Sequence, residues 1–187
     1  SPGTDYYEIS VVQGTTHKYH RDLPATTTHS YFGTAPAPGF HYLGPTIVAQ
    51  SGTPVKIKFT NNLPLGPHLI DGAMDYTIMG TTDPSSPGGM DPWTDEHRIA
   101  VHLHGGKVES RFDGGPRDWF SPVGSGQANP YTDQGVIFPI GSYTYDYPND
   151  QPATMLWYHD HAWGITRFNP FLGQAAAYLI RDGVENG

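Results

Sequence analysis

The sequence predicts an all-β fold with long loops, a sandwich or Greek-key barrel built from many short antiparallel strands. Its 23 glycines and 18 prolines make up more than a fifth of the 187 residues, where an average protein has about 12%. These residues favour turns over packed helices. Apolar and polar residues alternate in several segments, and no helical period continues beyond about ten residues.

Seven segments carry the alternating or continuously apolar pattern of strands. Within 54–61, for example, Val55, Ile57 and Phe59 alternate with polar residues, which predicts a strand with one face in water. The full set of expected strands is 6–12, 46–50, 54–61, 98–105, 141–148, 153–161 and 175–181.

Between the expected strands lie long stretches without a regular pattern. Residues 64–97 and 111–131 are rich in glycine and proline, and loops of that length are uncommon unless they serve a function. The segment 163–168 is the best short helix. Because no linker or internal repeat divides the chain, we expect residues 1–187 to form a single domain.

Charge and composition exclude several classes of function. The formal net charge is −8 and no cluster of Lys and Arg is present, so nucleic acid is not an expected partner. The longest apolar run, 175–180, is far shorter than the roughly 20 residues of a membrane span. The chain has no cysteine, which excludes disulfides, thiolate metal ligands and cysteine nucleophiles within it.

Ten histidines are the unusual feature of the composition, and four of them form two H-x-H pairs. His102 and His104 lie on one expected strand, and His159 and His161 lie at the end of another. Residues i and i+2 of a strand point to the same face, about 6.6 Å apart. If the two strands are neighbours, four imidazoles form a small square that could hold two or more metal ions. The other six histidines have no ligand spacing, so we expect them in loops or on the surface.

The spacing alone leaves the metal open, because imidazole binds Cu, Zn, Fe and Ni. His102, His104 and Glu109 match the H-x-H-x4-E spacing of a cupin metal site. The second cupin motif, a lone His after a Pro-x-Gly turn, is not found. A metallo-β-lactamase site is excluded because position 106 is glycine.

At this point the sequence resembles a known family, the multicopper oxidases of the laccase type, and specifically their N-terminal cupredoxin domain. Asp113-Gly114 followed by Trp119-Phe120 is closest to the bacterial spore-coat laccase and bilirubin oxidase branch. The resemblance covers nearly the whole chain and is carried by residues 44–47, 55–63, 102–106, 157–161 and 164–182.

The resemblance implies a cupredoxin-like Greek-key barrel or sandwich and a role for each paired histidine. His102 would bind a type 2 copper, and His104, His159 and His161 would bind the type 3 pair. In the family, this trinuclear cluster reduces O₂ to water with electrons taken one at a time from a small reducing substrate such as a phenol. Asp113 would line the solvent path and relay protons, although Asp-Gly is also a common turn pair.

The departure from the family is as informative as the match. The blue type 1 copper needs a cysteine thiolate, and this chain has none. We therefore expect the remaining cupredoxin domains on a second, longer, non-covalently bound chain that begins just past Gly187. The family further implies a secreted, cell-surface or spore-coat location. Two alternatives remain open: a stand-alone cupin-type metalloenzyme using His102, His104 and Glu109, and a non-catalytic cupredoxin interaction module.

Overall fold

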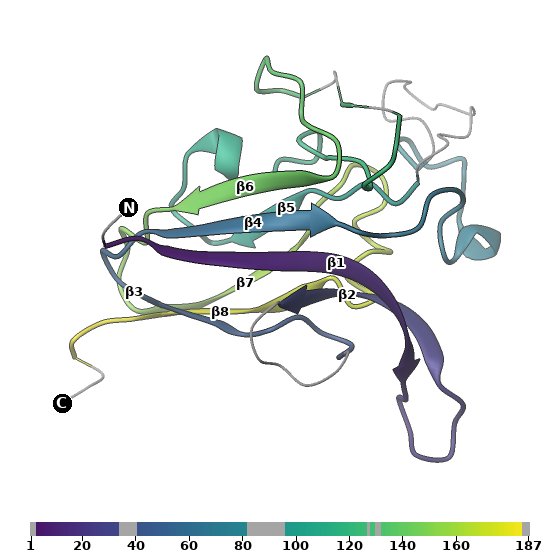
Figure 1. The fold of residues 1–187 in the computed structure, drawn as a ribbon, viewed down its shortest axis with the longest axis horizontal. Helices are drawn as coiled ribbons and strands as arrows, with labels where there is room; N and C mark the ends of the chain where they lie inside the picture. Colours follow the sequence, from purple (N-terminus) through teal and green to yellow (C-terminus); the bar gives the residue numbers. More distant parts are fainter. Residues whose placement is uncertain (1–2, 34–40, 82–95, 127, 130–131, 185–187) are drawn as a thin grey trace.

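The computed structural model is a sandwich of two four-stranded sheets (Figure 1). It describes residues 3–33, 41–81, 96–126, 128–129 and 132–184. The strands are β1 (Asp5–His17), β2 (Thr26–Gly33), β3 (Ile47–Gln50), β4 (Val55–Asn61), β5 (Val101–His104), β6 (Ser142–Tyr147), β7 (Thr154–Asp160) and β8 (Ala175–Arg181), with two single 3₁₀ turns, η1 (Asp71–Ala73) and η2 (Ser110–Phe112).

The strand order is β2-β1-β4-β6 in one sheet and β3-β8-β7-β5 in the other. The all-β sandwich is therefore confirmed, but the expectation of purely antiparallel pairing is wrong for two pairs. β1 and β4 are parallel, as are β3 and β8. The cause is the path of the chain: β1 and β2 form a hairpin, β3 then joins the opposite sheet, and β4 returns to the free edge of β1 in the same direction.

All seven predicted strands are present, with ends that differ by a few residues, except that β1 continues to His17. The strand that the pattern missed is β2, because its buried positions include the polar residues Thr28, His29 and Ser30. The helix expected at 163–168 is wrong. That segment is a series of turns, and Gly164 within it has a φ of +75° that no helix accepts.

The core lies between the two sheets, where alternate residues of each strand point inward. Ile57 and Phe59 of β4 are fully buried, as the period-two pattern predicts. Tyr145 of β6 crosses the core, and its hydroxyl accepts a hydrogen bond of 3.0 Å from the Val101 amide at the start of β5. This bond ties one sheet to the other beside the first H-x-H pair.

The two long irregular stretches, 64–97 and 111–131, contain none of the eight strands in their described residues. η1 lies in the first and η2 in the second, while the parts at 82–95, 127 and 130–131 lie outside the described residues. Within the described part of the chain, no helix has the length and apolar character needed to cross a bilayer.

Three histidines expected in loops or on the surface are buried instead. His29 of β2 is 0% exposed, and His68 and His97, from the loop between β4 and β5, are each 2% exposed. We call these three the inner histidines. Desolvation is the main cause that lowers their pKa values, to about 2 for His29 and to about 4 for His97, and it also lowers the pKa of His68. They are therefore neutral in the folded protein at neutral pH.

The inner histidines predict how stability depends on pH. A histidine of the unfolded chain titrates near pH 6.5, so the stability of the native state is complete above that pH and falls as the pH drops toward the folded pKa values. Replacing His97 by Leu should reduce the slope of the unfolding free energy against pH, between pH 6 and pH 4, by up to about 1.4 kcal/mol per pH unit. Urea unfolding at several pH values measures this slope.

The control for this prediction is His20→Leu, because His20 is exposed and close to Asp22 on the surface. The charged neighbours of the inner histidines, Asp71, Glu96 and Arg98, are unchanged in both variants. Parallel stability curves for His97→Leu and the native protein would contradict the prediction.

Candidate metal centre

The pairing of β5 with β7 brings the two H-x-H pairs together on the outer face of their sheet. His102 lies opposite His159, and His104 lies opposite Trp157. His161 follows the end of β7, where its amide donates a 2.7 Å hydrogen bond to the Ala100 carbonyl. The intervening residues of both strands point into the core, because side chains alternate along a strand.

The four imidazoles form a staggered group rather than the expected square. The ring of His102 has its centre 5.6 Å from that of His104, 5.5 Å from that of His159 and 4.8 Å from that of His161. The His159 ring lies 5.7 Å from His104 and 5.8 Å from His161. The stagger follows from the register, which places His161 one step beyond His102 along the sheet.

The nitrogen atoms are close enough for metal binding. One nitrogen each from His102, His104 and His159 lies within 4.8 Å of the other two, and among the described residues this is the one group of three or more potential ligands that meets this distance. Glu109 is not in the group. Its carboxylate forms an ion pair of 2.9 Å with Arg111 in solvent, so the cupin-type ligand set is not assembled.

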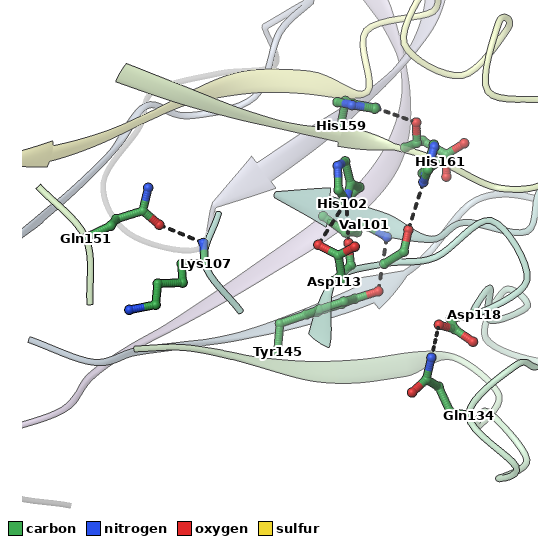
Figure 2. A network of polar contacts seen from close by, with 12 residues as sticks. Val101, His102, Lys107, Asp113, Asp118, Gln134, Tyr145, Gln151, His159 and His161 are labelled. Atoms are coloured by element: carbon green, nitrogen blue, oxygen red, sulfur yellow. Dashed lines mark hydrogen bonds and ion pairs between the residues drawn. The ribbon is translucent and has the colours of Figure 1, made fainter. Parts of the chain in front are cut away.

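Backbone carbonyl groups orient three of the four rings (Figure 2). The Nδ1 of His102 meets the Asp113 carbonyl, that of His159 meets the Asp160 carbonyl at 2.7 Å, and that of His161 meets the Gly114 carbonyl at 3.1 Å. A carbonyl only accepts, so each Nδ1 carries the proton and Nε2 is left with its lone pair. The Nε2 of His159 is buried without a partner, which fits a metal ligand.

The electrostatics of the group also favour a metal. Desolvation lowers the pKa of His159 to about 4, and the charges of His102 and His161 add to the effect. Desolvation likewise lowers the pKa of His102. His102 and His159 are therefore neutral at neutral pH, which is the form that binds metal ions.

Asp160, between the two histidines of the second pair, holds the surrounding backbone in place. Its buried carboxylate accepts hydrogen bonds from the Ala100 amide at 2.9 Å, the Ala162 amide at 3.1 Å and the Asn169 side chain at 2.9 Å. It points away from the ligands, as the strand geometry predicts. Asn169 was not recognisable from the sequence, because its partners are distant in the chain and no local motif marks it.

Trp157 lies beside the histidines and not beneath them. Its ring stacks on His159 with centres 4.0 Å apart, contacts His104 at 5.3 Å, and is 40% exposed. Met155 and Val48 continue the same face of the sheet and are 73% and 47% exposed. The histidine group is therefore bordered by apolar surface that is open to solvent.

Asp113 lies next to the histidine group. Its carboxylate oxygen is 3.4 Å from the Nδ1 of His102, and the side chain is 44% exposed (Figure 2). A half-exposed carboxylate in contact with a partly buried imidazole joins the group to the solvent. The residue also ends η2, and the chain bends at Asp113 before Gly114.

Gly114 is required by the close approach of this turn to β5. Its φ is +68°, and a Cβ atom there would lie 2.0 Å from the Val101 carbonyl oxygen. The glycine thus lets the loop pass against the strand, so that the carbonyl groups of Asp113 and Gly114 reach the rings of His102 and His161.

Comparison with known proteins shows relatives along the whole chain. It is 38% identical to a laccase of Bacillus stratosphericus, over 99% of this chain and 31% of that protein. It is also 38% identical to a laccase of Bacillus subtilis, over 96% of this chain and 30% of that one, and 38% identical to the rice protein Multicopper oxidase LPR1 homolog 1, over 88% and 24%. The chain thus spans about a third of the length of the two laccases. No family model matches it.

Solved structures share the fold. A multi-copper oxidase from Pediococcus acidilactici superposes with a TM-score of 0.63 at 21% identity, over 100% of this chain and 27% of that one. A multi-copper oxidase from Pseudomonas thermotolerans gives a TM-score of 0.56 at 16% identity, over 96% and 30%. At these identities the likeness establishes the cupredoxin-like architecture of the sandwich.

The close approach of Gly114 predicts a strong effect of Gly114→Ala. The added methyl group must displace the loop from β5, so the variant should lose at least about 3 kcal/mol of stability and bind metal more weakly. Gly124→Ala is the matched control, since Gly124 has a φ of +86° but nothing lies within 4 Å of its Cβ position. The control should lose only about 1 kcal/mol.

Urea unfolding and copper titration of the two variants check this. Equal losses of stability in both would show that the left-handed backbone conformation, and not the contact with Val101, decides the effect.

Proposed function

Because this chain is homologous along its length to laccases and multicopper oxidases, we propose that residues 1–187 are the single N-terminal cupredoxin domain of such an oxidase. The whole protein would oxidise a small reducing substrate, such as a phenol, by one electron at a time and reduce O₂ to water. The observation that carries the proposal is the histidine group: four imidazoles on one sheet face, three of them with Nδ1 on a backbone carbonyl.

The proposed ligands are divided between two kinds of copper. His102 would hold the type 2 ion, and His104, His159 and His161 would hold the type 3 ions. When bound, copper supplies the one-electron redox chemistry that O₂ reduction requires. The support from this chain is the neutral state of His102 and His159 and the Nε2 atom that each Nδ1–carbonyl bond leaves for a metal.

The remaining residues of the site would position ligands and control access. The carbonyl groups of Asp113 and Gly114 fix the ring orientations of His102 and His161. Trp157 covers one side of His159 and shields it from water. Asp113 would accept protons from solvent and pass them toward the site, because its carboxylate is half-exposed and touches His102.

The remaining ligands and the type 1 copper would come from further cupredoxin domains outside residues 1–187. Four histidines cannot complete three copper sites. The exposed Trp157, Met155 and Val48 extend the surface around them, and a hollow of about 560 Å³ lies further along, where β7 begins and β8 ends. Such a face is suited to burial against another domain. The secreted, cell-surface or spore-coat location stays a prediction.

The proposal predicts a specific defect for His104→Ala and His161→Ala in the assembled oxidase. Each variant should lose O₂ reduction by at least about 100-fold, since a missing ligand leaves the cluster incomplete. Electron transfer from substrate to the type 1 copper should continue. Anaerobic bleaching of the blue band followed by admission of O₂ separates the two steps, and His20→Ala, on the exposed surface, is the control. Normal reoxidation in either variant would refute the ligand roles.

The proposed role of Asp113 predicts slower turnover in Asp113→Asn without loss of copper. The amide keeps the backbone turn and the carbonyl contact to His102 but cannot carry a proton. O₂ consumption should fall by about 10²-fold or more, within the range for lost general acid–base catalysis, and Asp113→Glu should recover part of it. Copper content is measured alongside. Turnover equal to that of the native enzyme in Asp113→Asn would leave the residue a turn former only.

A further inference from the structure

The inner histidines form a second cluster of imidazoles. His29 comes from β2, and His68 and His97 come from distant positions in the loop between β4 and β5, yet their rings lie close together. The ring centres are 5.1 Å apart for His29 and His97, 5.3 Å for His68 and His97, and 6.0 Å for His29 and His68. All three side chains are at least 98% buried. Nothing in the proposed oxidase chemistry uses them.

Each inner histidine is held by an oxygen acceptor on one side of its ring. The Nε2 of His29 meets the side-chain oxygen of Gln13 at 3.2 Å. The Nε2 of His68 meets Oδ1 of Asn169 at 2.9 Å. Asn169 donates from its own nitrogen to Asp160, so its oxygen faces His68 and the His68 proton is on Nε2. The Pro64 carbonyl lies beside the His97 ring and raises its pKa slightly against the effect of burial.

The opposite nitrogens are short of partners. The Nδ1 of His29 has none, and neither nitrogen of His97 makes a hydrogen bond of ordinary geometry. The Nδ1 of His68 receives only a long contact of 3.4 Å from the Ile70 amide. Buried polar atoms without partners are costly and rare. One anchored nitrogen and one free nitrogen, as in His29, is the arrangement of metal-binding histidines, and His159 of the surface site has it too.

The spacing of the rings fits one ion. With a metal–nitrogen bond of about 2.0 Å and a ring centre about 1.2 Å further out, three imidazoles around an ion have centres about 5.5 Å apart. The inner rings lie at 5.1–6.0 Å. Their nitrogens do not all lie within 4.8 Å of one another, as those of the surface group do. Binding of one ion therefore requires the rings to turn about χ2, a torsion that histidine varies easily.

The charges around the cluster favour a monovalent ion. The inner histidines are neutral, and the nearby cation Arg98 acts against further positive charge at His68. Two carboxylates lie near His68: Glu96 accepts a hydrogen bond from the His68 amide at 2.8 Å, and the charge of Asp71 acts on His68 against that of Arg98. Burying an ion costs less when its charge is smaller, and copper binds imidazole well.

We propose that His29, His68 and His97 form a second metal site, buried in the sandwich, that binds one cuprous ion through three imidazole nitrogens. Gln13, Asn169 and the Pro64 carbonyl hold the three rings from outside. The site is separate from the surface histidine group. The bound cuprous ion would stay cuprous and would take part in no step of the proposed oxidase reaction.

Anaerobic titration with Cu⁺ against a chromophoric cuprous chelator tests the proposal. The native protein should bind one equivalent more than His97→Leu, while His20→Leu should match the native protein. The surface ligands are intact in every variant, so failure of this test leaves the proposed oxidase function untouched. Equal binding by native protein and a folded His97→Leu variant would overturn the inner site.

A second measurement does not depend on a variant that folds. Crystals of the native protein grown with Cu⁺ under reducing conditions should give an anomalous peak at the copper edge among the three inner rings. A map with copper at His102, His104 and His159 but no peak at the inner histidines would also overturn the proposal.

Discussion

The buried carboxylate of Asp160 is the interaction on which the surface site depends. It accepts hydrogen bonds from the backbone of β5 at Ala100 and from the chain just beyond β7 at Ala162. These two points are each within two residues of a metal-ligand candidate. Burial raises the pKa of Asp160 to about 6, and the hydrogen bonds it accepts act in the opposite direction by stabilising its charge. The histidines therefore project from a backbone that the buried Asp160 carboxylate holds in place.

Asn169 connects this carboxylate to the interior. Its side chain donates to Asp160 and accepts from His68, so one hydrogen-bonded chain runs from His68 to the carboxylate that holds the backbone beside the surface histidines. Tyr145 holds the start of β5 separately, since its hydroxyl accepts from the Val101 amide across the core.

Local patterns of the sequence were sufficient to predict the strands with alternating apolar residues and the pairing of the histidines on one face. Val55, Ile57 and Phe59 are buried as their spacing predicts, and two residues of separation place His102 and His104 on one face. β2 was missed because it buries Thr28, His29 and Ser30, against the usual apolar pattern. The inner histidines could not be found, since their contacts join residues up to 68 positions apart. The stagger of the surface group depends on the register between β5 and β7, which no single strand encodes.

The surface histidines stand on the outer side of a finished sheet, with the apolar core entirely on its other side. Their backbone is held by Asp160 and by strand pairing, neither of which includes a metal. The sandwich can therefore complete its folding while these four ligands are still empty, and copper can be delivered later to a surface that is already shaped. On the proposed copper function, maturation of this site would be a loading step on a folded domain, because the histidines lie on the outer side of β5 and β7.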